Sequence, residues 1–67
     1  MSIVKVIELV GESTKSWDDA VEQAVEEANK SVDNIIGVEV MNNTGKVENG
    51  RIVEYKADVH IAFRVNN

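Results

Sequence analysis

The first ten residues show the pattern of a strand that is apolar on both faces. Residues 3–10 form a β-branched run that ends at Gly11, which predicts a β-strand. Lys5 is the one charged residue on one face of this run and Glu8 is the one on the other. A strand of this kind is normally covered on both faces. Because one helix cannot cover both, we expect a second subunit to contribute.

A helical repeat follows a predicted loop at residues 11–15. Ser16 and Asp19 fit an N-cap with an acidic residue three positions later, and Asp18 and Asp19 suit the positive end of the helix dipole. Apolar residues then recur at spacings of three and four, which predicts a helix over residues 16–32 with one buried stripe. The stripe consists of Trp17, Ala20, Val21, Ala24, Val25, Ala28 and Val32.

The second half of the chain has the pattern of a β-hairpin. Residues 35–41 and 52–65 predict two strands, with short extensions at 46–47 and 52–53. Asn49-Gly50 predicts a type I′ turn between them. One face of the last strand is apolar and should pack on the helix; it carries Tyr55, Ala57, Val59, Ile61, Phe63 and Val65, joined by Val38 and Val40. Trp17, Tyr55 and Phe63 are therefore expected in the core.

These elements predict an α+β fold in a single domain, residues 1–67. The order is β-α-β-β, with a three-stranded antiparallel sheet partly wrapped around one helix. With 67 residues, a single core supplies only about 3–5 kcal/mol of stability. The chain has no cysteine and one histidine, so disulfides and a self-contained zinc site are excluded. Oligomerisation is the remaining way to reinforce such a small fold, and the alternative is a monomer with a well-packed core.

The opposite face of the last strand is polar and offers one candidate site. Asp58 and His60 lie on it, and strand parity places Gly37, Glu39 and Met41 beside them. Glu39, Asp58 and His60 could bind a divalent cation or titrate near neutral pH. The alternative is that these polar residues pair with their neighbours at a subunit interface.

Charge and missing motifs exclude several classes of function. The net charge of −5 and the scattered lysines and arginines exclude a nucleic-acid surface. The sequence has no nucleophile motif, no phosphate-binding glycine loop and no zinc-protease motif, so we expect no enzyme. No run is long enough to span a membrane, and Met1–Gly11 is too short and too acidic for a signal peptide. We expect a cytoplasmic protein.

Several segments, in this order, resemble the dodecin family: Val6–Gly11, Ser13, Ser16-Trp17 ahead of an alanine-rich helix, Ser31–Asn34, and Gly50–Val65. The resemblance covers nearly the whole chain. It implies a hollow homododecamer that is not an enzyme. Typical members bind riboflavin or FMN in paired stacks between subunits and act as flavin stores or buffers.

Two positions depart from the flavin-binding members of the family. Those members carry a tryptophan on the second strand and a glutamine on the third, where this chain has Gly37 and Lys56. Stacking contributes about 1–3 kcal/mol per aromatic face, so its loss from two symmetry-related subunits weakens flavin binding by about 2–6 kcal/mol. The pattern resembles the dodecins without this tryptophan, of which a calcium-binding form is known. We expect a shell that binds small ligands, flavin weakly; the alternatives are a Ca²⁺-binding or a purely structural homo-oligomer.

Overall fold

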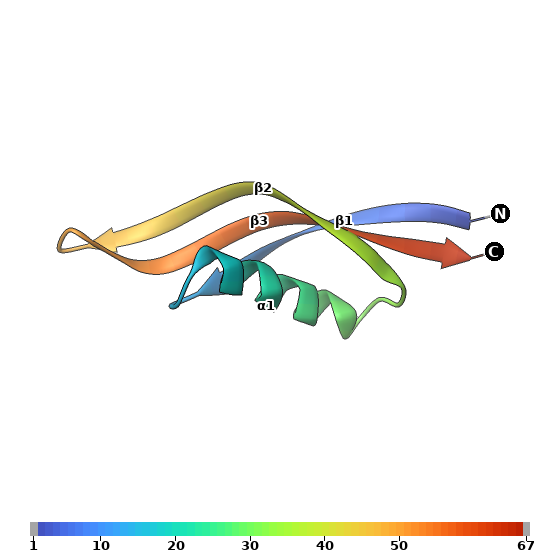
Figure 1. The fold of residues 1–67 in the computed structure, drawn as a ribbon, viewed down its shortest axis with the longest axis horizontal. Coiled ribbons are helices and arrows are strands. Elements are labelled where there is room, and N and C mark those ends of the chain that lie inside the picture. Colours follow the sequence, from blue (N-terminus) through green and yellow to red (C-terminus); the bar gives the residue numbers. More distant parts are fainter. Residues whose placement is uncertain (1, 67) are drawn as a thin grey trace.

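The computed structural model describes residues 2–66 and contains three strands and one helix (Figure 1). The elements follow in the order β1 (Ser2–Ser13), α1 (Trp17–Asn29), β2 (Ile35–Glu48) and β3 (Arg51–Asn66). The strands form one antiparallel sheet in the order β1-β3-β2, so β3 is the central strand. The predicted β-α-β-β fold with a three-stranded antiparallel sheet is confirmed.

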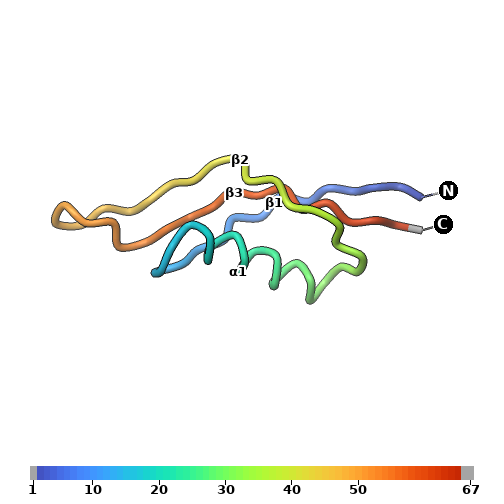
Figure 2. The backbone as a smooth tube through the Cα atoms, viewed as in Figure 1, coloured from blue at the N-terminus to red at the C-terminus, as the bar shows by residue number. Residues whose placement is uncertain are grey.

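The subunit is long and thin. Its principal extents are 53 × 19 × 13 Å, and its Cα radius of gyration is 13.8 Å. A compact domain of this length would have a radius of gyration of about 11 Å. Figure 2 shows why: the start of β1 and the end of β3 extend together at one end of the molecule, and the β2–β3 turn extends at the other, beyond the helix. The helix therefore covers only the middle of the sheet.

The strands are longer than the apolar patterns predicted. Residues 11–13, expected in a loop, continue β1 because they pair with residues 55–57 of β3. Residues 42–48 likewise continue β2, which pairs with β3 as far as Glu48. The sequence pattern did not predict these extensions, because their side chains are mainly polar and show no apolar alternation. They pair nevertheless, since the hydrogen bonds between strands form between backbone groups that every residue here possesses.

Hydrogen bonds define where the helix begins and where it ends. Ser16 is the N-cap as predicted, and its side chain accepts a hydrogen bond from the backbone N–H of Asp19. The helix ends at Asn29, earlier than the predicted 32, and the chain tightens there: the N–H groups of Lys30 and Ser31 donate to carbonyls three residues earlier, those of Glu27 and Ala28. The Asn49-Gly50 turn has φ values of 53° and 76°, as the predicted type I′ turn requires.

The fully buried core is smaller than predicted and is made mainly of alanine. It consists of Ala20, Ala24, Ala28, Ala57, Val59 and Ile61. Trp17, Tyr55 and Phe63, expected in the core, are only partly buried. Their placement there was wrong because α1 covers β1 and the middle of β3 but extends over neither end of β3.

Gly11 allows α1 to approach the sheet this closely. A Cβ atom at Gly11 would collide with the carbonyl oxygen of Ala20 and would lie 3.2 Å from the methyl group of Ala24. Val38 and Val40 lie opposite Ile61 and Val59, on the helix side of the sheet as predicted. They are nevertheless 44% and 46% exposed, since α1 leaves β2 largely uncovered.

Candidate ligand-binding face

The sheet face turned away from α1, called here the outer face, carries the predicted polar residues. The strand register places Glu39 directly opposite His60, and Asp58 follows the same parity on β3. The register also places Glu8 of β1 opposite His60, from the other side. Glu39, Asp58 and His60 therefore lie on one face of the sheet, as predicted, and Glu8 lies on the same face.

Glu8 is the residue that the sequence-based candidates missed. Its Oε2 atom lies 3.7 Å from Nε2 of His60. The available signal was a single carboxylate in an otherwise apolar face of the first strand. That signal could not identify a partner, because the pairing of the first strand with the last is fixed only when the sheet forms.

The carboxylate of Asp58 affects the ionisation of Glu8. A hydrogen bond with Asp58, the negative charge of Asp58 and desolvation raise the pKa of Glu8 above its ordinary value of 4.5, while His60 acts in the opposite direction. Within residues 2–66, the Oδ1 atom of Asp58 is buried and has no hydrogen-bond partner. A carboxylate oxygen in this state can accept a bond from a proton or a cation.

One subunit alone does not bring the three metal candidates into a metal site. In the described part of the chain, no group of three or more histidine, aspartate or glutamate residues is arranged to hold a metal ion. On β3, Asp58 lies opposite Asn42 and Val10, whereas Glu39 and Glu8 lie opposite His60. Within the described subunit, Glu39, Asp58 and His60 therefore do not form an assembled cation site.

A shallow hollow of about 240 Å³ lies on the outer face around Gly37. Its lining consists of Val6, Gly37, Val38, Glu39, His60 and Ala62. No atom lies within 4 Å of the position that a Cβ on Gly37 would occupy, so the surface there is open. Its lining combines apolar residues with the ionisable side chains of Glu39 and His60.

Lys56 does not share this hollow. On β3 it pairs with Thr44, whereas Gly37 pairs with Ala62. At a rise of about 3.4 Å per residue, positions 56 and 62 are about 20 Å apart. The Lys56 ammonium lies 3.7 Å from Glu12 and 3.6 Å from Glu54. A pocket that used both Gly37 and Lys56 would have to take them from different copies.

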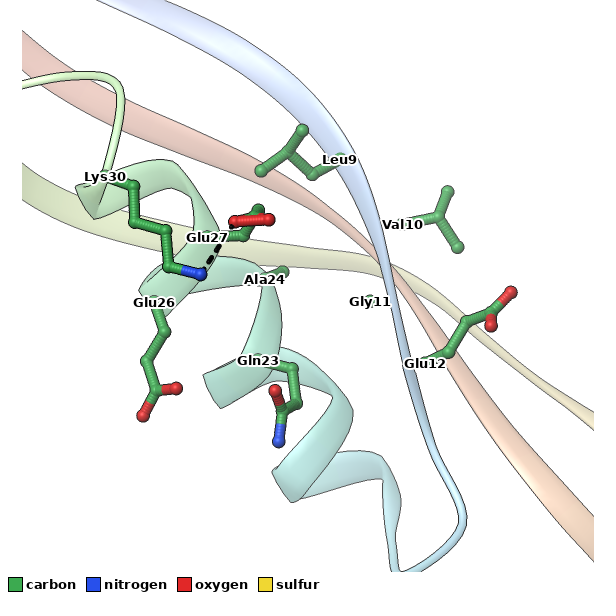
Figure 3. A pocket seen from close by; sticks show the side chains of 9 residues that line it. All are labelled: Leu9, Val10, Gly11, Glu12, Gln23, Ala24, Glu26, Glu27 and Lys30. Atoms are coloured by element: carbon green, nitrogen blue, oxygen red, sulfur yellow. Dashed lines mark ion pairs between the residues drawn. The ribbon is translucent and has the colours of Figure 1, made fainter.

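A larger hollow, of about 360 Å³, lies between α1 and the free edge of β1 (Figure 3). Glu12, Glu26, Glu27 and Lys30 line it, and all four are exposed. Lys30 is already paired with Glu27 at 3.3 Å. Solvated, paired charges of this kind give little binding energy, so the outer face remains the better candidate.

Trp17 is fixed against the β2–β3 hairpin. Its indole Nε1 donates a 2.8 Å hydrogen bond to the carbonyl of Thr44. Its ring meets Tyr55 edge-on, with centroids 4.8 Å apart and an interplanar angle of 85°. Both contacts lie on the helix side, so Trp17 cannot provide a stacking surface on the outer face.

Comparison with known proteins gives one consistent family. The chain matches the Dodecin family over residues 3–66. It is 32% identical over 65 residues to calcium dodecin from Mycobacterium tuberculosis, a match that covers 97% of this chain and 92% of that protein. That protein has a crystal structure, in which it is described as a calcium-chelating immunodominant antigen with a novel calcium-binding site. It aligns with a TM-score of 0.82 and 30% identity over 96% of this chain and 91% of that chain.

Two further structures align more closely in backbone at lower identity. Dodecin from Streptomyces coelicolor gives a TM-score of 0.92 with 27% identity, over 98% of this chain and 94% of that chain. A protein from Thermus thermophilus gives 0.94 with 25% identity, over 100% and 98%. Among residues 2–66, no helix is long and apolar enough to cross a bilayer. The chain thus belongs to the dodecin family, whose members are small binding proteins and not enzymes.

Proposed function

We propose that this chain is the subunit of a homododecameric shell that binds a small ligand where subunits meet. The observation that carries this proposal is the exposed apolar surface of the isolated subunit. Eleven large apolar side chains are at least 38% exposed: Ile3, Val4, Val6, Val10, Ile36, Val38, Val40, Met41, Val47, Ile52 and Val53. They lie on all three strands, so every strand leaves apolar surface that a second copy of the chain would cover.

The size of the core supports the same conclusion. Val59 and Ile61 are the largest fully buried side chains among residues 2–66. A core made otherwise of alanine contributes little, because burial is worth about 25 cal/mol per Å² of apolar surface. Association of copies would bury the remaining valines and isoleucines and so stabilise each subunit.

The outer face is the proposed place for the ligand. The hollow around Gly37 measures about 240 Å³, whereas pockets for small molecules usually measure about 300–1,000 Å³. Two such hollows facing each other across a subunit contact would reach that range. Flavin would bind weakly there, since Gly37 provides no ring and Lys56 lies at the other end of the face.

Calcium is the second candidate ligand. Two observations favour it: the unpartnered Oδ1 of Asp58 near Glu8, and the similarity to calcium dodecin. Ca²⁺ takes six to eight oxygen ligands, more than one subunit gathers here. The cation would therefore bind where the outer faces of several copies meet, with Glu8, Glu39 and Asp58 as candidate ligands.

Native mass spectrometry tests the main proposal, because it counts subunits and weighs what is bound. We expect a species of twelve subunits, and light scattering at micromolar concentration should give the same mass. A stable monomer would contradict the proposal.

Calorimetry with Ca²⁺ tests the second candidate. Asp58→Ala should weaken Ca²⁺ binding by at least about tenfold, since it removes a charged ligand. Asp33→Ala, at an exposed position after the helix, is the matched control and should leave binding unchanged. No binding by the parent, or equal binding by both variants, would return Asp58 to a structural role.

A further inference from the structure

The β2–β3 hairpin continues well beyond the rest of the subunit. β1 ends at Ser13, which pairs with Tyr55, so β3 has no β1 partner before that position. Residues 46–54, called here the arm, are therefore two-stranded. Figure 1 shows the arm extending past the start of α1, with the turn at its tip. An isolated two-stranded ribbon is at best marginally stable in water, and both of its edges are unpaired.

The arm carries apolar side chains that the subunit does not cover. Val47 and Ile52 are directly opposite each other and so share a face. That face continues the helix side of the sheet. A Cβ on Gly45 would lie 3.3 Å from Cγ2 of Ile52 and 3.5 Å from Cζ2 of Trp17. Val47 is 61% exposed and Ile52 43% exposed. Both side chains therefore remain accessible on the described subunit.

Contacts with Trp17 fix the point where the arm leaves the rest of the subunit. The indole of Trp17 donates a hydrogen bond to the carbonyl of Thr44, which precedes the arm on β2. Its ring packs edge-on against Tyr55, which follows the arm on β3. Within the arm, Lys46 lies 3.5 Å from Glu48. An element that is fixed at its base needs less ordering when a partner binds, which reduces the entropy cost of association.

The charge of the arm indicates what it contacts. Its ionisable residues are Lys46, Glu48, Arg51 and Glu54, so its net charge is zero, and the rest of the chain carries the whole net charge of −5. Two copies of an acidic chain repel each other over most of their surfaces. The arm is a neutral, apolar surface that can meet another acidic copy without this repulsion.

We infer that the arm is the element by which one copy holds the next, with the face of Val47 and Ile52 docked on an apolar surface of a second copy. This inference rests on the proposed shell and specifies which part of the subunit closes it. Covering the arm would also bury part of the Trp17 indole, the single tryptophan of the chain.

The experiment compares the parent with Val47→Asp/Ile52→Asp and with Val47→Thr/Ile52→Thr. Native mass spectrometry and light scattering measure assembly, and circular dichroism measures the fold. Because the proposed contact would bury Val47 and Ile52 and the variant places charges there, we expect the double aspartate variant to weaken assembly by at least about tenfold. Trp17 emission should shift to longer wavelength in parallel. The threonine variant keeps the β-branched shape and should weaken assembly less.

Ser31→Asp/Asn34→Asp is the charge-matched control, at two exposed positions that follow α1. Loss of the shell in the arm variants but not in the control supports the inference. A shell that forms equally well in the arm variants overturns the inference and leaves the proposed function standing. Equal loss of assembly in the control and in the arm variants also overturns the inference, because the effect would then come from added charge and not from the arm. A monomeric parent overturns both. If the aspartate variant fails to fold, the threonine variant decides, since an unchanged assembly constant there contradicts the inference.

Discussion

The hydroxyl of Ser13 donates a 2.6 Å hydrogen bond to Oδ2 of Asp19 and thereby joins the end of β1 to the first turn of α1. The same oxygen accepts hydrogen bonds from the backbone N–H groups of Lys15, at 2.9 Å, and Ser16, at 3.4 Å. In a standard capping box the acidic side chain would reach the N-cap N–H directly. Here Ser13 stands between them, so one buried hydroxyl organises the whole β1–α1 connection.

Ser13→Ala should therefore lower the free energy of unfolding by about 1–2 kcal/mol, because two N–H groups and the Asp19 carboxylate lose a partner in a partly buried place. Urea denaturation at fixed protein concentration measures the change. Ser31→Ala, at an exposed serine, is the matched control and should have little effect. Equal stability of both variants would show that water replaces the Ser13 hydroxyl.

Gly11→Ala should destabilise the subunit by about 1–3 kcal/mol or more, since the new methyl group would push α1 away from the sheet. Thermal unfolding followed by circular dichroism measures the loss. Gly37→Ala is the matched control in the same sheet: nothing lies within 4 Å of its Cβ position, so it should be neutral or slightly stabilising. A normal melting temperature for Gly11→Ala would mean that α1 can shift at little cost.

The raised pKa of Glu8 predicts the direction of a pH dependence. Its main cause is the hydrogen bond with Asp58, followed by the charge of Asp58 and desolvation. A carboxyl group that binds its proton more tightly in the folded state stabilises the fold at low pH, and this contribution is lost as the pH rises through the folded pKa. The loss should therefore begin near pH 4.5, the ordinary value, and continue above it.

Glu8→Gln should remove that part of the pH dependence and raise stability at neutral pH relative to the parent. Denaturation midpoints measured between pH 4 and pH 7 would show it. Glu22→Gln, on the exposed face of α1, changes the net charge equally and should keep the slope of the parent. A parent slope that survives in Glu8→Gln would contradict the coupling between Glu8 and Asp58.

Flavin should bind weakly, so riboflavin or FMN fluorescence should be quenched little at micromolar protein. Gly37→Trp with Lys56→Gln should restore part of the quenching, because the open surface at Gly37 can accept an indole and stacking contributes about 1–3 kcal/mol per face. Fluorescence titration measures both, with Lys56→Gln alone as the control. Tight flavin binding by the parent would show that another side chain provides the stacking.

Local patterns were sufficient for most of the fold. The three-and-four spacing of alanine and valine predicted α1, because helical side chains repeat every 3.6 residues. Ser16 predicted its start and Asn49-Gly50 predicted the turn, since each acts through its own backbone conformation. Strand parity alone also placed Glu39, Asp58 and His60 on one face, because successive side chains of a strand alternate.

The tertiary structure decided what depends on residues far apart in the chain. Only the pairing of β1 with β3 brings Glu8 to His60, and only the packing of α1 on β1 and β3 leaves β2 largely uncovered. The same arrangement leaves Trp17, Tyr55 and Phe63 at the margins of the core and separates Gly37 from Lys56. Apolar periodicity reports which face of an element is buried, but not how far its neighbour extends along it. That extent is set by strand order and helix length, and it determines which apolar residues remain for another copy of the chain to cover.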